Sequence, residues 1–162
     1  MSLLKGSRDD HVSISFSPLL LSSLCGLAQD VVIGAGFDPD GGGGMVLEYH
    51  KGGEFSGEAK NWPWAAAIRA DADSDLWVGA GVHRQFNLSS RLFIEASFMP
   101  GYYNPEDTDL GGNIHFRTLA GLGLRLGGDS ALSVSVDHLS NGGLTSSNPG
   151  SELVSVRYIY TY

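Results

Sequence analysis

Cysteine is almost absent from this chain of 162 residues, and its single example, Cys25, excludes an internal disulfide. Long apolar runs are absent too, since nothing reaches the roughly 18 consecutive apolar residues of a membrane-spanning helix. Basic residues are scarce, with 10 Lys and Arg against 18 Asp and Glu. The resulting net charge of −8 argues against a nucleic-acid partner, which calls for a basic surface.

Glycine and aromatic residues, in contrast, are abundant. The chain has 23 Gly, 7 Phe, 6 Tyr and 3 Trp, and 42% of its residues are apolar. This composition suits a small β-barrel with small inward-facing residues and aromatic side chains toward lipid. The length indicates one domain.

The first 28 residues differ from the rest. Residues 12–28 are apolar and rich in serine, and Gly26-Leu27-Ala28 forms a small-x-small cleavage site before Gln29. We therefore predict a signal peptide over 1–28 and a barrel domain over 29–162.

From Asp30 onward, apolar residues recur at every second position between clusters of turn residues, a pattern typical of β-strands. The eight predicted strands lie within residues 31–37, 45–50, 62–70, 76–83, 92–98, 114–126, 132–140 and 152–162. An even number of short alternating strands predicts an all-β fold, an eight-stranded antiparallel transmembrane β-barrel of the outer membrane with both termini in the periplasm.

Several polar side chains fall on the opposite parity from the apolar stripe, and a small barrel has no channel to hydrate them. They are Glu48, His50, His83, Glu95, His115, Arg117 and Arg125. We interpret them as a structural network of ion pairs inside the barrel. The histidines lack metal-ligand spacing, so no metal site is predicted.

One polar group falls instead on the apolar parity, where the last two strands meet. His138 and Ser140 share the face of the strand before the final loop, and Glu152 shares the corresponding face after it. If these strands are antiparallel neighbours, the loop brings Glu152 beside His138. A nucleophile, a base and a carboxylate are the groups of a hydrolytic triad. Asp137 is the rival carboxylate, but its parity points it away from His138.

The run His-Leu-Ser-Asn-Gly-Gly-Leu at 138–144, followed by Asn-Pro-Gly at 148–150 and then Glu152, resembles the lipid A 3-O-deacylases of the PagL family. Weaker similarity covers residues 92–96 and 110–124. The resemblance implies an outer-membrane barrel that hydrolyses the ester-linked 3-hydroxyacyl chain at position 3 of lipid A, without metal or cofactor. Its partners would be lipopolysaccharide and the outer-membrane bilayer.

The resemblance also implies residue roles. His138 would be the general base, Ser140 the nucleophile and Glu152 the orienting acid. Asn141 and Gly143 would donate hydrogen bonds to the oxyanion. The chain departs from the family at position 142, where Gly replaces the frequent Ala.

The chain ends on alternating aromatic residues at 158–162. This ending resembles the signal that the barrel assembly machinery reads on outer-membrane proteins. The sequence leaves open whether the protein forms a homodimer.

Two other functions compete with the deacylase. One is a non-enzymatic small outer-membrane barrel, disfavoured because an idle His and Glu on a lipid-facing wall would be costly. The other is a calcium-dependent outer-membrane lipid hydrolase, which chelation by EDTA would distinguish.

Overall fold

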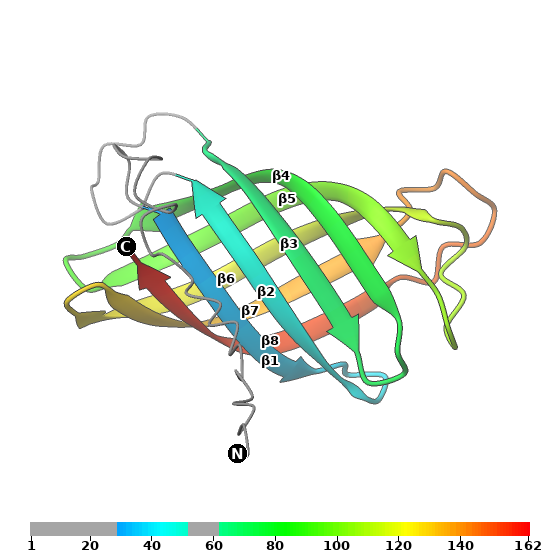
Figure 1. Cartoon of the computed structure of the whole chain (residues 1–162), viewed down its shortest axis with the longest axis horizontal. Helices are drawn as coiled ribbons and strands as arrows, with labels where there is room; N and C mark the ends of the chain where they lie inside the picture. The colour runs from blue at the N-terminus through cyan, green and yellow to red at the C-terminus, as the bar shows by residue number, and fades with distance from the viewer. Residues whose placement is uncertain (1–28, 52–61) are drawn as a thin grey trace, which may run out of the picture.

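The structure, a computed structural model, describes residues 29–51 and 62–162, which form one closed antiparallel β-barrel (Figure 1). Its strands are β1 (Gln29–Phe37), β2 (Gly43–Lys51), β3 (Trp64–Asp71), β4 (Leu76–Asn87), β5 (Leu92–Asn104), β6 (Ile114–Gly127), β7 (Ser130–Ser140) and β8 (Ser151–Thr161). The predicted eight-stranded antiparallel barrel is confirmed. The predicted signal peptide, and residues 52–61 between the second and third predicted strands, lie outside the described residues. Residues 29–51 and 62–162 contain no helix that is long and apolar enough to span a membrane.

The barrel closes because its first strand pairs with its last. β1 lies antiparallel to β8, with Asp30 opposite Thr161. Backbone hydrogen bonds in both directions between Gln29 and Tyr162, of 3.1 and 2.9 Å, complete the seam at the chain terminus. Every strand therefore has a paired neighbour on each side, which removes the exposed sheet edges that promote aggregation.

The outer wall is apolar. Outward residues alternate with buried ones along each strand, and large apolar side chains stay exposed on the outside, with Val134 at 56% and Val156 at 58%. A continuous apolar surface of this extent is unfavourable in water. It matches the hydrocarbon-facing band of an outer-membrane barrel.

The interior is filled by a connected set of ion pairs. Arg157 lies between two acids, with Nη1 at 2.6 Å from Glu95 Oε1 and Nη2 at 2.8 Å from Glu48 Oε2. Arg117 joins Glu48 at 2.9 Å to Asp137 at 2.8 Å. These side chains are fully buried, so each charge depends on its partners to offset the cost of leaving water.

Two histidines extend the network. The His50 and His83 rings stack with centroids 3.9 Å apart, and their Nε2 atoms contact Glu48 at 2.8 Å and Glu95 at 3.2 Å. The interior network predicted from parity is thus confirmed for Glu48, His50, His83, Glu95 and Arg117. Arg125 differs from the expectation because it lies half-buried near the end of β6, where it donates to the side chains of Gln85 and Asn87.

The connections fall into two sets at opposite ends of the barrel. Those joining β1 to β2, β3 to β4, β5 to β6 and β7 to β8 gather at the right-hand end in Figure 1, away from the C-terminus. β5 continues to Asn104, six residues beyond the predicted strand at 92–98, because Tyr103 is buried and its amide pairs with the carbonyl of Asn113. If both termini lie in the periplasm, as predicted, the four gathered connections would face the outside of the cell.

Candidate active site

His138 and Glu152 lie directly opposite one another on neighbouring strands. His138 is near the end of β7, Glu152 is near the start of β8, and the register pairs them. Both side chains point outward, because the residues on either side of His138, Asp137 and Leu139, are fully buried. The expected folding of Glu152 back beside His138 is therefore present.

A hydrogen bond joins the two side chains. His138 Nδ1 is 2.8 Å from Glu152 Oε1, and the side chains are 45% and 39% exposed. A carboxylate at this distance holds the proton on Nδ1 and leaves Nε2 as the acceptor. The imidazole is thus oriented and has a basic nitrogen available for a proton.

Ser140 lies two residues beyond His138 on the same outward face, half-buried and opposite Phe116 of β6. Within the described residues, its hydroxyl forms no hydrogen bond with His138. The structure thus joins the expected base to the expected acid and places the expected nucleophile next along the same face. In free enzymes the bond between nucleophile and base is often long and tightens only with substrate.

Asn141 points inward and organises the loop that follows Ser140. Its side chain is buried, and its Nδ2 lies 2.9 Å from the carbonyl of Gly111 and 2.6 Å from that of Ser147. Its Oδ1 accepts from the amide of Gly143 at 2.9 Å, and its own amide donates to Asn148 Oδ1 at 2.9 Å. The side-chain amide of Asn141 and the backbone amide of Gly143 are therefore both used within the loop.

Two N–H groups near Ser140 donate no hydrogen bond within the loop. Among the described residues, neither the backbone amide of Gly142 nor the side-chain NH₂ of Asn148 donates a hydrogen bond. Gly142 has φ of 65°, a backbone conformation that favours glycine. The sequence pattern did not single out these two donors, since it shows which residues are present but not which N–H groups stay unpaired.

Asp137 is excluded as a partner of His138. It is fully buried inside the barrel, where Oδ1 accepts from Arg69 and Oδ2 from Arg117, each at 2.8 Å. Arg69 also donates to the hydroxyl of Ser151. The expectation that Asp137 faces away from His138 is confirmed, and the interior network reaches the barrel wall directly beneath the candidate site.

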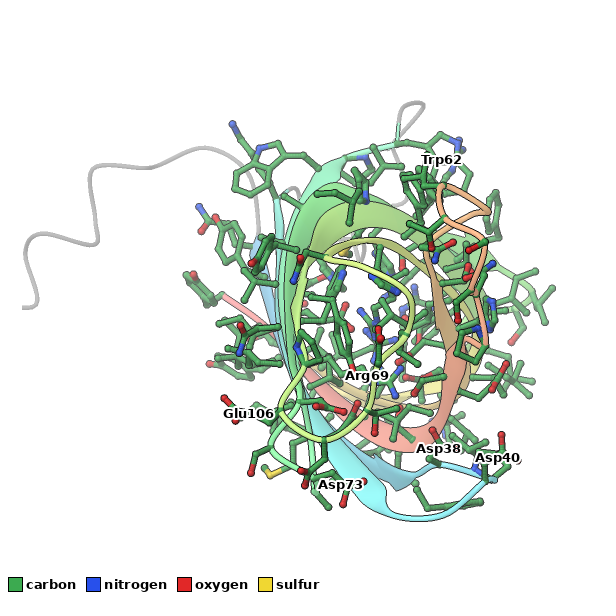
Figure 2. All side chains as sticks on the ribbon, turned by 90° about the vertical axis from the view of Figure 1, so that its right-hand side faces the viewer. Asp38, Asp40, Trp62, Arg69, Asp73 and Glu106 are labelled. Atoms are coloured by element: carbon green, nitrogen blue, oxygen red, sulfur yellow. The ribbon has the colours of Figure 1, made fainter. Side chains whose placement is uncertain are left out.

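The open end beside the site is acidic. Figure 2 shows Asp38, Asp40, Asp73 and Glu106 around this end, with Arg69 inside the barrel. A cavity of about 310 Å³ lies here, lined in part by these aspartates and by 149–151 of the β7–β8 connection. In the part of the chain that the structure describes, no group of three or more His, Cys, Asp or Glu side chains is placed to hold a metal ion.

The family model described as "Lipid A 3-O-deacylase (PagL)" matches residues 43–161, which include His138, Ser140 and Glu152. This chain belongs to the PagL family. It is therefore a lipid A 3-O-deacylase, a carboxylic ester hydrolase of the bacterial outer membrane, and the family resemblance read from residues 138–152 is confirmed.

Solved structures agree on the fold. The crystal structure of the outer membrane enzyme PagL superposes with a TM-score of 0.65 at 21% identity, covering 81% of this chain and 98% of that one. A de novo designed transmembrane β-barrel gives 0.61 at 14% identity, covering 83% and 95%. Neisserial surface protein A gives 0.52 at 12% identity, covering 83% and 95%. Comparison with curated protein sequences gave no significant match.

Proposed function

We propose that this PagL-family protein cleaves the 3-O-acyl ester of lipid A with a triad of Ser140, His138 and Glu152. The main support is the 2.8 Å bond from His138 to Glu152, on the lipid-facing wall and beside an outward serine. A triad at the loop end of β7 and β8 would lie at the edge of the apolar outer wall, where an ester of a membrane lipid can reach it.

The reaction has two halves. Ser140 Oγ attacks the ester carbonyl carbon while His138 Nε2 takes the hydroxyl proton. The bond from that carbon to the sugar oxygen then breaks, and His138 returns the proton to this oxygen. Water, deprotonated by His138, then attacks the carbonyl carbon of the acyl-serine. The bond from that carbon to Ser140 Oγ breaks, His138 returns the proton to Oγ, and the fatty acid leaves. Glu152 fixes the imidazole tautomer and stabilises the imidazolium in both halves.

The segment from Asn141 to Gly143 supports the oxyanion in this proposal. Asn141 and Gly143, the donors expected from the family pattern, hold the loop in shape through their mutual bond. The unpaired Gly142 amide and the Asn148 side-chain NH₂ then supply the hydrogen bonds to the oxyanion. Removal of one such donor typically lowers the rate constant by about a hundredfold to a thousandfold.

The acyl chain has an apolar surface to follow below the triad. Outward valines pair across the two strands, Val136 with Val154 and Val134 with Val156. A chain lying along them stays within the hydrocarbon layer while its ester reaches Ser140. Binding of this kind requires no extraction of the lipid from the bilayer.

Replacement of Ser140 tests the proposal. Ser140→Ala should insert and fold normally but leave the lipid A acyl pattern, measured by mass spectrometry, as in cells without the protein. Ser130→Ala is the matched control, since Ser130 lies on the same strand and parity at the opposite end. Deacylation retained by Ser140→Ala would refute the triad, and loss of wild-type activity in EDTA would favour a calcium-dependent hydrolase.

We also propose that residues 1–28 form a cleaved leader and that the aromatic C-terminus, from Tyr158 to Tyr162, is read by the barrel assembly machinery. The intact mass of the membrane-inserted protein should then correspond to a chain that begins at Gln29. A mature protein that retains residues 1–28 would contradict the leader.

A further inference from the structure

A buried carboxylate in the β3–β4 turn holds the β5–β6 loop. Asp75 is 3% exposed, and its Oδ1 accepts from the backbone amides of Glu106 at 2.7 Å and Asp107 at 3.1 Å. Its Oδ2 accepts from the hydroxyl of Tyr103 at 2.8 Å. Buried charge-assisted bonds of this kind are strong and directional, so this carboxylate fixes the start of the loop.

The same loop is fixed again four residues later, this time to the loop after Ser140. Leu110 is buried with Leu139 and Tyr103 in the core below the barrel mouth. Its carbonyl accepts from Asn141 Nδ2 at 3.3 Å, and that of Gly111 accepts from the same atom at 2.9 Å.

The contact at Gly111 is close as well as hydrogen-bonded. A Cβ added at this glycine would lie 1.9 Å from the carbonyl oxygen of Ser147, and its φ is 86°. Thr145 also donates its hydroxyl to the Gly111 carbonyl. The β5–β6 loop and the β7–β8 loop therefore meet without space for an intervening side chain.

These contacts connect the β3–β4 turn to the residue next to the proposed nucleophile. Asp75 holds the backbone at 106–108, that segment leads to Leu110 and Gly111, and their carbonyls hold Asn141. Because Asn141 directly follows Ser140, the position of its side chain sets the direction in which the strand leaves Ser140. A displacement of about 1 Å at a reacting group can lower a rate constant a hundredfold.

We infer that Asp75 is a positioning residue for the deacylation, acting through the β5–β6 loop and Asn141 on Ser140. The inference rests on the proposed role of Ser140 as nucleophile. Asp75 itself does not touch the substrate in this scheme.

Three variants test it. Asp75→Ala removes all the acceptors for the loop amides. Asp75→Asn keeps Oδ1 for those amides, while Tyr103 can still donate to the carbonyl of Thr108, 2.8 Å away. Asp73→Ala is the matched control, since Asp73 is an exposed carboxylate in the same turn.

Each variant is purified as the folded full barrel, and the folded fraction is measured by heat-modifiable mobility on gels. kcat and KM are then measured on lipid A in detergent micelles, together with the rate at which a fluorophosphonate labels Ser140. We expect Asp75→Ala to lower kcat and the labelling rate about tenfold or more, with KM changed by less than about twofold. Asp75→Asn should recover most of the loss, and Asp73→Ala should match the wild type.

Wild-type labelling and kcat in Asp75→Ala would overturn the inference, as would a loss that only follows the folded fraction. If Asp75→Ala does not fold, Tyr103→Phe is measured in its place, because it removes the hydrogen bond from Tyr103 to Asp75. We again expect a lower kcat and a lower labelling rate, and wild-type values of both would overturn the inference. Ser140→Ala is measured in parallel. Activity or labelling that survives in Ser140→Ala refutes the role of Ser140 as nucleophile. If Ser140→Ala is inactive while Asp75→Ala has wild-type activity and labelling, only the positioning role of Asp75 is refuted.

Discussion

Gly150 lies directly against the imidazole ring of His138. A Cβ added at Gly150 would come within 2.8 Å of His138 Cε1 and 3.6 Å of Nδ1. The glycine also has φ of 75°, which favours glycine at this point in the loop. The loop can therefore close over the ring that faces Glu152 only because position 150 carries no side chain.

Gly150→Ala should accordingly turn the ring of His138 away from Glu152. We expect kcat to fall about tenfold or more, because a small misplacement of a catalytic group is costly. Gly128→Ala is the control for backbone strain alone, since Gly128 has φ of 60° and an added Cβ there meets nothing within 4 Å. Equal kcat values for the two variants, measured on micellar lipid A, would contradict the importance of this contact.

Glu152→Gln keeps the shape of the side chain but removes the charge that stabilises the imidazolium. We expect kcat to fall about a hundredfold or more, with little change in KM, because the charge matters mainly in the transition state. The fold should be unaffected, since Glu152 is half-exposed on the barrel wall. Glu106→Gln, an exposed change at the same end of the barrel, is the control. A kcat near the wild-type value would remove Glu152 from the mechanism.

Arg157→Met tests the interior network. It leaves Glu95 with its hydrogen bond to His83 but without Arg157, and Glu48 without one of its two arginines. Breaking a buried pair by removal of one partner typically costs about 3–5 kcal/mol, because the remaining charge stays buried. Urea unfolding in lipid vesicles should show this loss for Arg157→Met and not for the exposed Arg91→Ala. Adding Glu95→Gln should restore part of the stability, and failure to do so would argue against the pairing.

The stabilisation that Asp75 contributes should depend on pH, and the direction follows from the shift of its pKa. Burial alone would raise the pKa of Asp75, but hydrogen bonds from the Glu106 amide, the Tyr103 hydroxyl and the Asp107 amide outweigh it and lower the pKa below its usual value. A lowered pKa means that the folded state binds the proton less readily than the unfolded chain. The stabilisation is thus complete above the unfolded pKa of about 3.9 and is lost as the pH falls below it.

Hydrogen exchange measures this directly. Protection of the Glu106 and Asp107 amides should stay constant from about pH 7 to about pH 4 and then fall as Asp75 gains its proton. In Asp75→Asn, protection of these amides should vary much less in the same range. The same acid-induced loss in both proteins would show that another group controls the loop.

The sequence predicted the barrel because alternation with period two is a local property of each strand. It also predicted the pairing of His138 with Glu152, since both lie on the outward parity beside one loop. Asn141 shares the inward parity of Asp137, but the family pattern assigned it to the oxyanion, so its bonds within the loop were not predicted. The same alternation along β8 places Arg157 inside the barrel, because its neighbours Val156 and Tyr158 point outward.

Other contacts could not be predicted in this way. Arg157 meets Glu48 and Glu95 across the lumen, from strands that are not neighbours, so the pairing depends on barrel width and strand stagger. Asp75 meets the amide of Glu106 across 31 residues, through two loops whose residues carry no periodicity. The availability of the Gly142 amide depends on which neighbouring N–H groups the loop has already used, and composition does not record this.

The interior of this barrel is occupied by arginine, histidine and carboxylate side chains, and the proposed triad lies on its convex outer wall. Lipid can then reach Ser140 by sideways movement within its own leaflet, and the fatty acid departs into the same layer. Turnover in such an arrangement scales with the mole fraction of lipid A among its neighbours in the membrane plane rather than with its concentration in bulk. Diluting the substrate with inert lipid at constant total amount should slow this enzyme, much as dilution with water slows a soluble one.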